Sequence, residues 1–184
     1  MQRAKIILGI IAILSICTAF NLKPKTECAK KVSVSGTVMH TGVFCGGMRI
    51  SDERLEEIKK PKVFANKKLF VKKGTKNDLK KKPVLEFVSD SSGNFSFSLP
   101  PGEYCIVEEL KKDKKNYDKL LNEYKTDTKN FSAISPTCLA EWFKTPDAVL
   151  TVTKSAVTNF TITFQNKCKW KQVPCVTYRG PMPN

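Results

Sequence analysis

The chain has 184 residues, of which 32 are lysine or arginine, 17 are aspartate or glutamate and one is histidine, so its formal charge is +15 at pH 7. All but four of the basic residues are lysine, whereas arginine is the residue that suits bidentate contacts to phosphate, so the charge does not indicate a nucleic-acid-binding protein. With one histidine and no Cys-x-x-Cys pair, the chain lacks zinc-type ligand spacing, and we expect no metal and no other cofactor.

Residues 1–19 have the three parts of a secretory signal peptide. Arg3 and Lys5 form its basic start, and the apolar stretch that follows is shorter than the about 20 residues of a membrane span. Small residues at its end predict cleavage that leaves residues 20–184, with a charge of +13 because the leader carries two bases and no acid. A lipoprotein signal with a lipid anchor on Cys17 is the alternative. Either reading predicts a secreted, periplasmic or cell-surface protein without a membrane span after cleavage.

An even number of cysteines remains after cleavage, which in an exported chain predicts three disulfides. Six cysteines allow 15 pairings, and the sequence leaves the pairing open. Only Cys168 and Cys175 are close enough along the chain to suggest a local disulfide. The disulfide candidates are Cys28, Cys45, Cys105, Cys138, Cys168 and Cys175.

The lysines are concentrated in residues 59–82 and 111–119. We interpret both runs as solvated, lysine-rich insertions or loops. The alternative is that they attract anionic glycans or lipid head groups.

Alternation of apolar and polar residues predicts a mostly β fold of about seven strands. The clearest strand has Phe160, Ile162 and Phe164 on one face and polar residues on the other. Residues 109–145 break the alternation with helical spacing, and the proline-rich end of the chain is expected to be a disulfide-stapled tail. The expected strands are residues 31–40, 68–72, 84–89 and 95–99, a return strand from residue 104, and residues 149–152 and 157–165.

Three motifs occur in order: V-S-G-T-V at residues 34–38, S-D-x-x-G-x-F-x-F at 89–97 and L-P-P-G-x-Y-x-I at 99–106. Together they resemble the carboxypeptidase regulatory-like, or prealbumin- and transthyretin-like, domain family. The resemblance covers less than half of the mature chain. It implies a single β-sandwich domain over residues 20–184, with a lysine-rich, partly helical insertion and a C-terminal extension.

Domains of this family are typically non-catalytic modules of exported and surface proteins. The resemblance therefore implies binding or scaffolding at the cell envelope, with an unknown protein or glycan as partner and no enzyme activity.

The sequence shows no arrangement of residues typical of an enzyme active site. The chain has neither a Gly-x-Ser-x-Gly nor a His-Glu-x-x-His motif. Residues 178–181 are similar to the Tyr-Arg-Gly-Ser end of transthyretin-fold hydroxyisourate hydrolases, but those enzymes need several histidines and His40 stands alone. The position of His40 in its strand predicts a partly buried, hydrogen-bonded ring instead.

A self-made crosslink is a further hypothesis. The collagen-adhesin B-type domains share this sandwich and join a lysine to an asparagine through an isopeptide bond promoted by a buried acid. Glu108 matches the position of that acid and Asn166 that of the asparagine, but residues 32–40, where the lysine is expected, contain none, and Lys30 and Lys31 precede them. The alternative is that Glu108 is a surface acid at a strand end.

Asp90, Ser92 and Asn94 place oxygen atoms around a turn, as calcium loops do. Because only one carboxylate is present, a turn in which Asp90 binds its own backbone is favoured over a metal site.

The second functional interpretation is a carbohydrate-binding module. Trp142, Trp170 and Tyr178 lie in irregular segments, where exposed rings could stack on sugars. The alternative is that these rings are part of the core.

Overall fold

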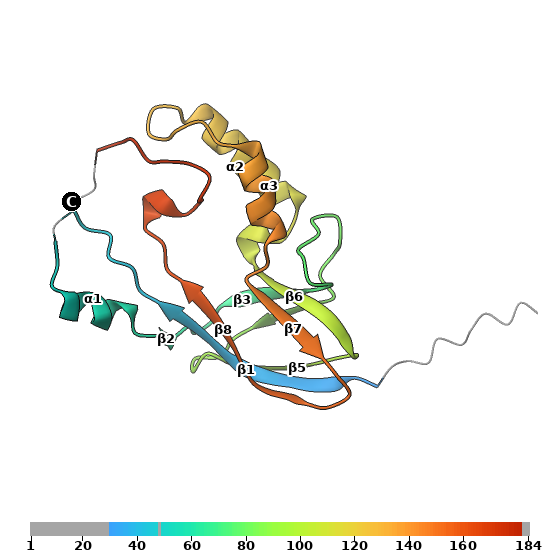
Figure 1. Cartoon of the computed structure of the whole chain (residues 1–184). Coiled ribbons are helices and arrows are strands. Elements are labelled where there is room, and N and C mark those ends of the chain that lie inside the picture. Colours follow the sequence, from blue (N-terminus) through green and yellow to red (C-terminus); the bar gives the residue numbers. More distant parts are fainter. Residues whose placement is uncertain (1–29, 48, 182–184) are drawn as a thin grey trace, which may run out of the picture.

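The computed structural model describes residues 30–47 and 49–181; the expected signal peptide, Cys17 and Cys28 lie outside them. These residues form two four-stranded sheets and three α-helices (Figure 1). Sheet A consists of β1 (Val32–Thr41), β2 (Lys62–Val63), β5 (Asn94–Leu99) and β8 (Val157–Gln165). Sheet B consists of β3 (Lys68–Lys73), β4 (Leu85–Val88), β6 (Gly102–Glu108) and β7 (Ala148–Val152). The helices are α1 (Asp52–Lys59), α2 (Lys114–Thr126) and α3 (Pro136–Lys144).

Strand β1 organises sheet A. It pairs antiparallel with β5, where Val32 lies opposite Leu99, and parallel with β8, where His40 lies opposite Phe164. Sheet B is antiparallel throughout, in the order β4-β3-β6-β7. All seven expected strands are confirmed, and β2 is an eighth that is too short to show alternation.

One apolar core lies between the two sheets. Sheet A contributes Val34, Val38 and Ile162, and sheet B contributes Ile106 and Leu150, all at most 1% exposed. Alternation along each strand supplies these residues, as the sequence predicts.

The glycine of the first strand has a steric role where β1 meets β8. A Cβ atom at Gly36 would overlap the carbonyl oxygen of Phe160. The register between the two strands also shifts here, next to Asn159, whose φ is 58°. The bulge and the glycine together let β8 approach β1 closely.

Sheet B is buried on its other face as well. Phe70, Lys72, Cys105 and Val107 alternate with the core residues of β3 and β6, and each is at most 1% exposed. A second apolar cluster provides the cover on that side, and its buried members come from α2, α3, the loop between these two helices and the tail. Its buried residues are Leu120, Tyr124, Ile134, Leu139, Phe143 and Val173.

A network of buried polar groups joins this helical layer to sheet B. Lys72 donates from Nζ to Oδ1 of Asn77 (2.8 Å) and to the carbonyl of Asp78 (2.9 Å). Asn77, 2% exposed, donates from Nδ2 to the carbonyls of Lys111 and Phe143, each at 2.8 Å. Burial lowers the pKa of Lys72, although neighbouring groups such as Cys105 and Asp78 oppose the shift.

The two lysine-rich runs are therefore not solvated throughout. Lys72 is fully buried and Lys111 is 5% exposed, which corrects the expectation for these two positions. Lys111 binds Asp147 at 2.8 Å and donates to the carbonyl of Thr145. Lysine count alone could not reveal this, because burial depends on partners contributed by distant segments.

Two of the three expected disulfides form within residues 30–47 and 49–181, and a bond to Cys28 would lie outside these residues. Cys45 binds Cys168 and Cys138 binds Cys175, so the suggested local Cys168–Cys175 pair is wrong. Cys105 is a free thiol on the helical side of sheet B, where its Sγ faces the carbonyl of Lys76 at 3.4 Å. The expected disulfide-stapled tail is confirmed, since both bonds tie the chain after β8 to earlier elements.

We predict that Asn77→Ala lowers the free energy of unfolding by about 3 kcal/mol, because it leaves several buried polar groups without partners. Asn122→Ala, on the exposed side of α2, is the matched control and should change stability by less than about 0.5 kcal/mol. Urea unfolding followed by circular dichroism measures both. Equal stabilities of the two variants would contradict the role given to Asn77.

We also predict that Cys105 resists alkylation in the native protein. Burial raises the pKa of its thiol, although the charge of Lys72 opposes this shift. The reagent therefore cannot reach the sulfur, and little of the reactive thiolate is present. Iodoacetamide at about pH 8 should label Cys105 only after denaturation, and this labelling should need no reductant. Labelling that requires a reductant would show that Cys105 forms a disulfide.

Candidate functional site

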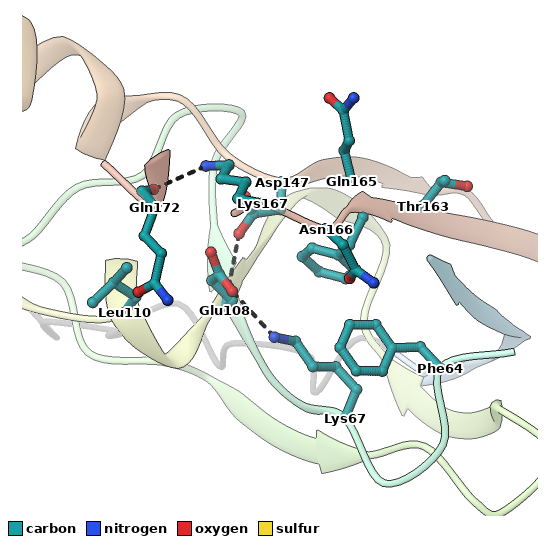
Figure 2. Close-up of a pocket in the computed structure, with 11 residues that line it drawn as sticks. Phe64, Lys67, Glu108, Leu110, Asp147, Thr163, Gln165, Asn166, Lys167 and Gln172 are labelled. Atoms are coloured by element: carbon teal, nitrogen blue, oxygen red, sulfur yellow. Dashed lines mark hydrogen bonds and ion pairs between the residues drawn. The ribbon is translucent and has the colours of Figure 1, made fainter. Parts of the chain in front are cut away.

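A pocket of about 300 Å³ opens where β6 and β8 end and the chain enters β3 (Figure 2). Its walls come from both sheets and from the tail. The residues that carry charge or an amide into it are Lys67, Glu108, Asp147, Gln165, Asn166, Lys167 and Gln172.

An ion pair lies at the centre of this pocket. Nζ of Lys67 lies 3.1 Å from Oε2 of Glu108, and the two side chains are only 21% and 24% exposed (Figure 2). Glu108 is the last residue of β6, and Lys67 immediately precedes β3. Ser89 fixes the backbone of Lys67, since its Oγ accepts the Lys67 N–H at 2.9 Å and its own N–H donates to the Lys67 carbonyl.

Two aromatic rings flank the ammonium group. Nζ of Lys67 lies 4.9 Å from the centre of the Phe64 ring and 5.0 Å from that of Phe164. Both distances suit a cation–π contact. The rings also displace water from one side of the ion pair, which strengthens its electrostatic attraction.

The backbone of Glu108 is held from the opposite side. Its N–H donates to Oδ2 of Asp147 at 2.8 Å, and Oδ1 of the same carboxylate binds Lys111. The side chains of Lys111 and Asp147 are 6% and 13% exposed, so this second ion pair is nearly buried. Glu108 is thus placed by two lysine–carboxylate contacts rather than being a free surface acid.

Asn166 lies on the wall contributed by sheet A. Its N–H donates to the carbonyl of Thr41 at 2.9 Å, which continues the pairing of β1 and β8 beyond the strand. Its Nδ2 lies 3.0 Å from Nδ1 of His40, whose ring packs edge-on against Phe64 at 4.9 Å. His40 is therefore a partly buried, hydrogen-bonded ring, as its position in the strand predicts.

The structure brings Glu108 and Asn166 into one pocket, and it supplies a lysine that the sequence reasoning missed. Lys67, which precedes β3, lies in the same pocket as Glu108 and Asn166, whereas Lys30 and Lys31 lie at the far end of β1, beside Pro101. Nothing in the sequence singles out Lys67 among its lysine neighbours, because its partner is 41 residues away.

The three aromatic candidates separate into two places. Trp170 and Tyr178 lie together in the tail, with ring centres 6.3 Å apart and planes inclined by 36°. Trp142 packs on the second apolar cluster, and the ammonium groups of Lys111 and Lys167 lie 5.1 and 5.0 Å from its ring. All three rings are half-buried, and Tyr178 also contacts Phe131 edge-on, with ring centres 5.3 Å apart.

The turn at Asp90 is an Asx turn. Its Oδ1 accepts the N–H groups of Ser92 and Asn94, each at 2.8 Å, so this oxygen already has two donors. Within residues 30–47 and 49–181, no group of three or more His, Cys, Asp or Glu side chains is placed to hold a metal ion. Across the same residues, no helix has the length and apolar character that crossing a membrane requires.

No protein-family model matches the chain, and no curated protein matches it. Among solved structures, the chain is similar to the Bacillus anthracis TIE protein, with 13% sequence identity and a TM-score of 0.33. The match covers 75% of this chain and 17% of that chain.

Proposed function

We propose that the protein is an exported, non-catalytic module with a prealbumin-like β-sandwich, which acts in binding or scaffolding at the cell envelope or surface. The leader-like residues 1–19 and the two disulfides support export, since disulfides persist in oxidising compartments. The three motifs of β1, β5 and β6 support the family resemblance.

One observation supports a scaffolding role: the ion pair of Lys67 and Glu108 lies in the same pocket as Asn166. Glu108 ends β6 and Lys67 precedes β3, both strands of sheet B, and Asn166 follows the last strand of sheet A, so the pocket joins the two sheets at one end. A covalent bond here would resist separation of the sheets under load.

We infer that Lys67 and Asn166 form an isopeptide bond, with Glu108 as the acid. Nζ of Lys67 bonds to Cγ of Asn166, the Cγ–Nδ2 bond breaks, and Glu108 relays the amine proton to the leaving nitrogen, so one ammonia is lost. Glu108, 3.1 Å from Nζ, is placed to accept one proton of the ammonium group so that the amine can attack, and this proton then leaves with the ammonia as ammonium. Asn166 must first leave His40, to which it is hydrogen-bonded.

We predict that the intact mass of the wild-type protein is lower by one ammonia than its sequence and disulfides require. Lys67→Arg and Asn166→Ala should each restore the full mass, because each removes one of the two groups that react. Lys68→Arg is the matched control, since Lys68 pairs with Glu86 on the exposed side, and it should keep the ammonia loss.

Peptide mapping should then recover the segments around Lys67 and Asn166 as one branched peptide. A wild-type mass equal to the full sequence mass, less only the hydrogens lost to disulfides, would rule out the crosslink. The pocket would then join the two sheets by non-covalent contacts alone.

A carbohydrate-binding module is the second candidate, and the pairing of Trp170 with Tyr178 favours it. Two neighbouring, partly exposed rings offer a stacking surface for a sugar ring. Both rings lie on the tail that the disulfide of Cys175 ties to α3, so the surface is held in place.

We predict that Trp170→Ala abolishes binding on a glycan microarray while leaving the melting temperature nearly unchanged. Trp142→Ala is the contrasting variant: it should keep glycan binding but lower stability by up to about 3–5 kcal/mol, because that ring packs on the apolar cluster. Loss of stability with Trp170→Ala, or no glycan bound by the wild type, would argue against this function.

A further inference from the structure

A second pocket, of about 430 Å³, lies between the segment after β3, the start of α2 and the end of α3. We propose that it binds a single-chain acyl carboxylate, with the hydrocarbon chain in the pocket and the carboxylate on lysines at its rim. The volume falls within the range of about 300–1,000 Å³ that is usual for small-molecule sites. This lysine-rimmed pocket is independent of the Lys67 site.

The floor of the lysine-rimmed pocket is mostly apolar. Leu79, Tyr117 and Ala140 line it, and the Tyr117 ring is fixed by an edge-to-face contact with Phe143, with centres 5.2 Å apart. The small side chain of Ala140 on α3 leaves space where a larger residue would fill the pocket.

The polar groups of the floor already have partners. The side chain of Asn77 gives its donors to the carbonyls of Lys111 and Phe143, and its oxygen accepts from Lys72. The Tyr117 hydroxyl faces the carbonyl of Pro136 at 3.4 Å. A sugar or peptide would bury its own polar groups against this floor without forming new hydrogen bonds, which costs free energy. A hydrocarbon chain has no such groups, so the floor favours it.

The rim selects an anion. It carries Lys76, Lys80, Lys114 and Lys144. Its one acid is Asp78, whose Oδ1 already accepts the N–H of Lys80 at 2.9 Å.

Two of the rim lysines are available for a ligand. Lys114 pairs with Asp118 and Lys144 with Glu141, each at 2.6 Å, whereas Lys76 and Lys80 form no ion pair within the part of the chain that the structure describes. The two unpaired ammonium groups would bind the carboxylate of the ligand, and the apolar floor would contact its acyl chain.

Titration with octanoate, decanoate and dodecanoate below their micelle concentrations, by isothermal calorimetry, tests the proposal on the chain with its disulfides intact. We expect affinity to rise about 15-fold for the two methylenes between octanoate and decanoate, as chain burial requires. Binding should weaken with salt, and dodecyltrimethylammonium should bind at least tenfold more weakly than dodecanoate, because the rim repels its charge.

Three variants locate the binding. Ala140→Phe should abolish it by filling the pocket, and Lys80→Glu should weaken it at least tenfold. Lys129→Glu removes an exposed lysine outside the pocket lining and should leave affinity unchanged. Melting temperatures of all variants confirm that they are folded.

Some results would overturn the proposal. These are no saturable binding of dodecanoate, or equal binding by wild type and a folded Ala140→Phe variant. Binding to phosphatidylglycerol vesicles without binding of free dodecanoate would also overturn it, since it would show surface attraction by lysines instead of an acyl pocket. None of these outcomes bears on the crosslink of Lys67, which mass spectrometry tests separately.

Discussion

The structure depends on how the outer face of sheet B is buried. Lys72 brings an ammonium group into that face, and Asn77 satisfies it while binding the backbone of the helical layer. The same chain of contacts continues through Lys111 to Asp147, and from Asp147 to the N–H of Glu108. One polar network therefore fixes the floor of the lysine-rimmed pocket and the position of the acid in the Lys67 site. Buried polar groups of this kind stabilise a fold only when every member has a partner.

The tail after β8 has a structural role of comparable weight. The disulfide of Cys45 and Cys168 ties it to the chain after β1, and that of Cys138 and Cys175 ties it to α3. Between these bonds the tail runs from the end of sheet A to the helical layer. It thereby closes one wall of the Lys67 site and holds Trp170 beside Tyr178. Crosslinks that close long loops remove the most conformational freedom from the unfolded chain, and the first bond spans 123 residues.

Local pattern predicted the strands well and the first helix not at all. Alternating residues and turn residues define β5, β6 and β8 within two residues, because both signals lie within a few positions of each other. Helix α1 has the local start signal, since Ser51 caps it and Asp52 opens it, but its eight residues include only two apolar side chains, both half-buried, which is too few for a clear helical pattern. The lysine runs were misjudged at Lys72 and Lys111 for the opposite reason, since their burial comes from residues far along the chain.

The sequence by itself determined the two-sheet β architecture and the positions of most strands, because both follow from patterns that repeat over short distances. Glu108 and Asn166, which share a pocket, were singled out by the resemblance to collagen-adhesin domains. Only the tertiary structure decided which cysteines pair, that Cys105 stays a free thiol, and that Lys67 faces Glu108. These outcomes rest on contacts between segments tens of residues apart, and the register and packing of two sheets decide such contacts. No local pattern encodes them.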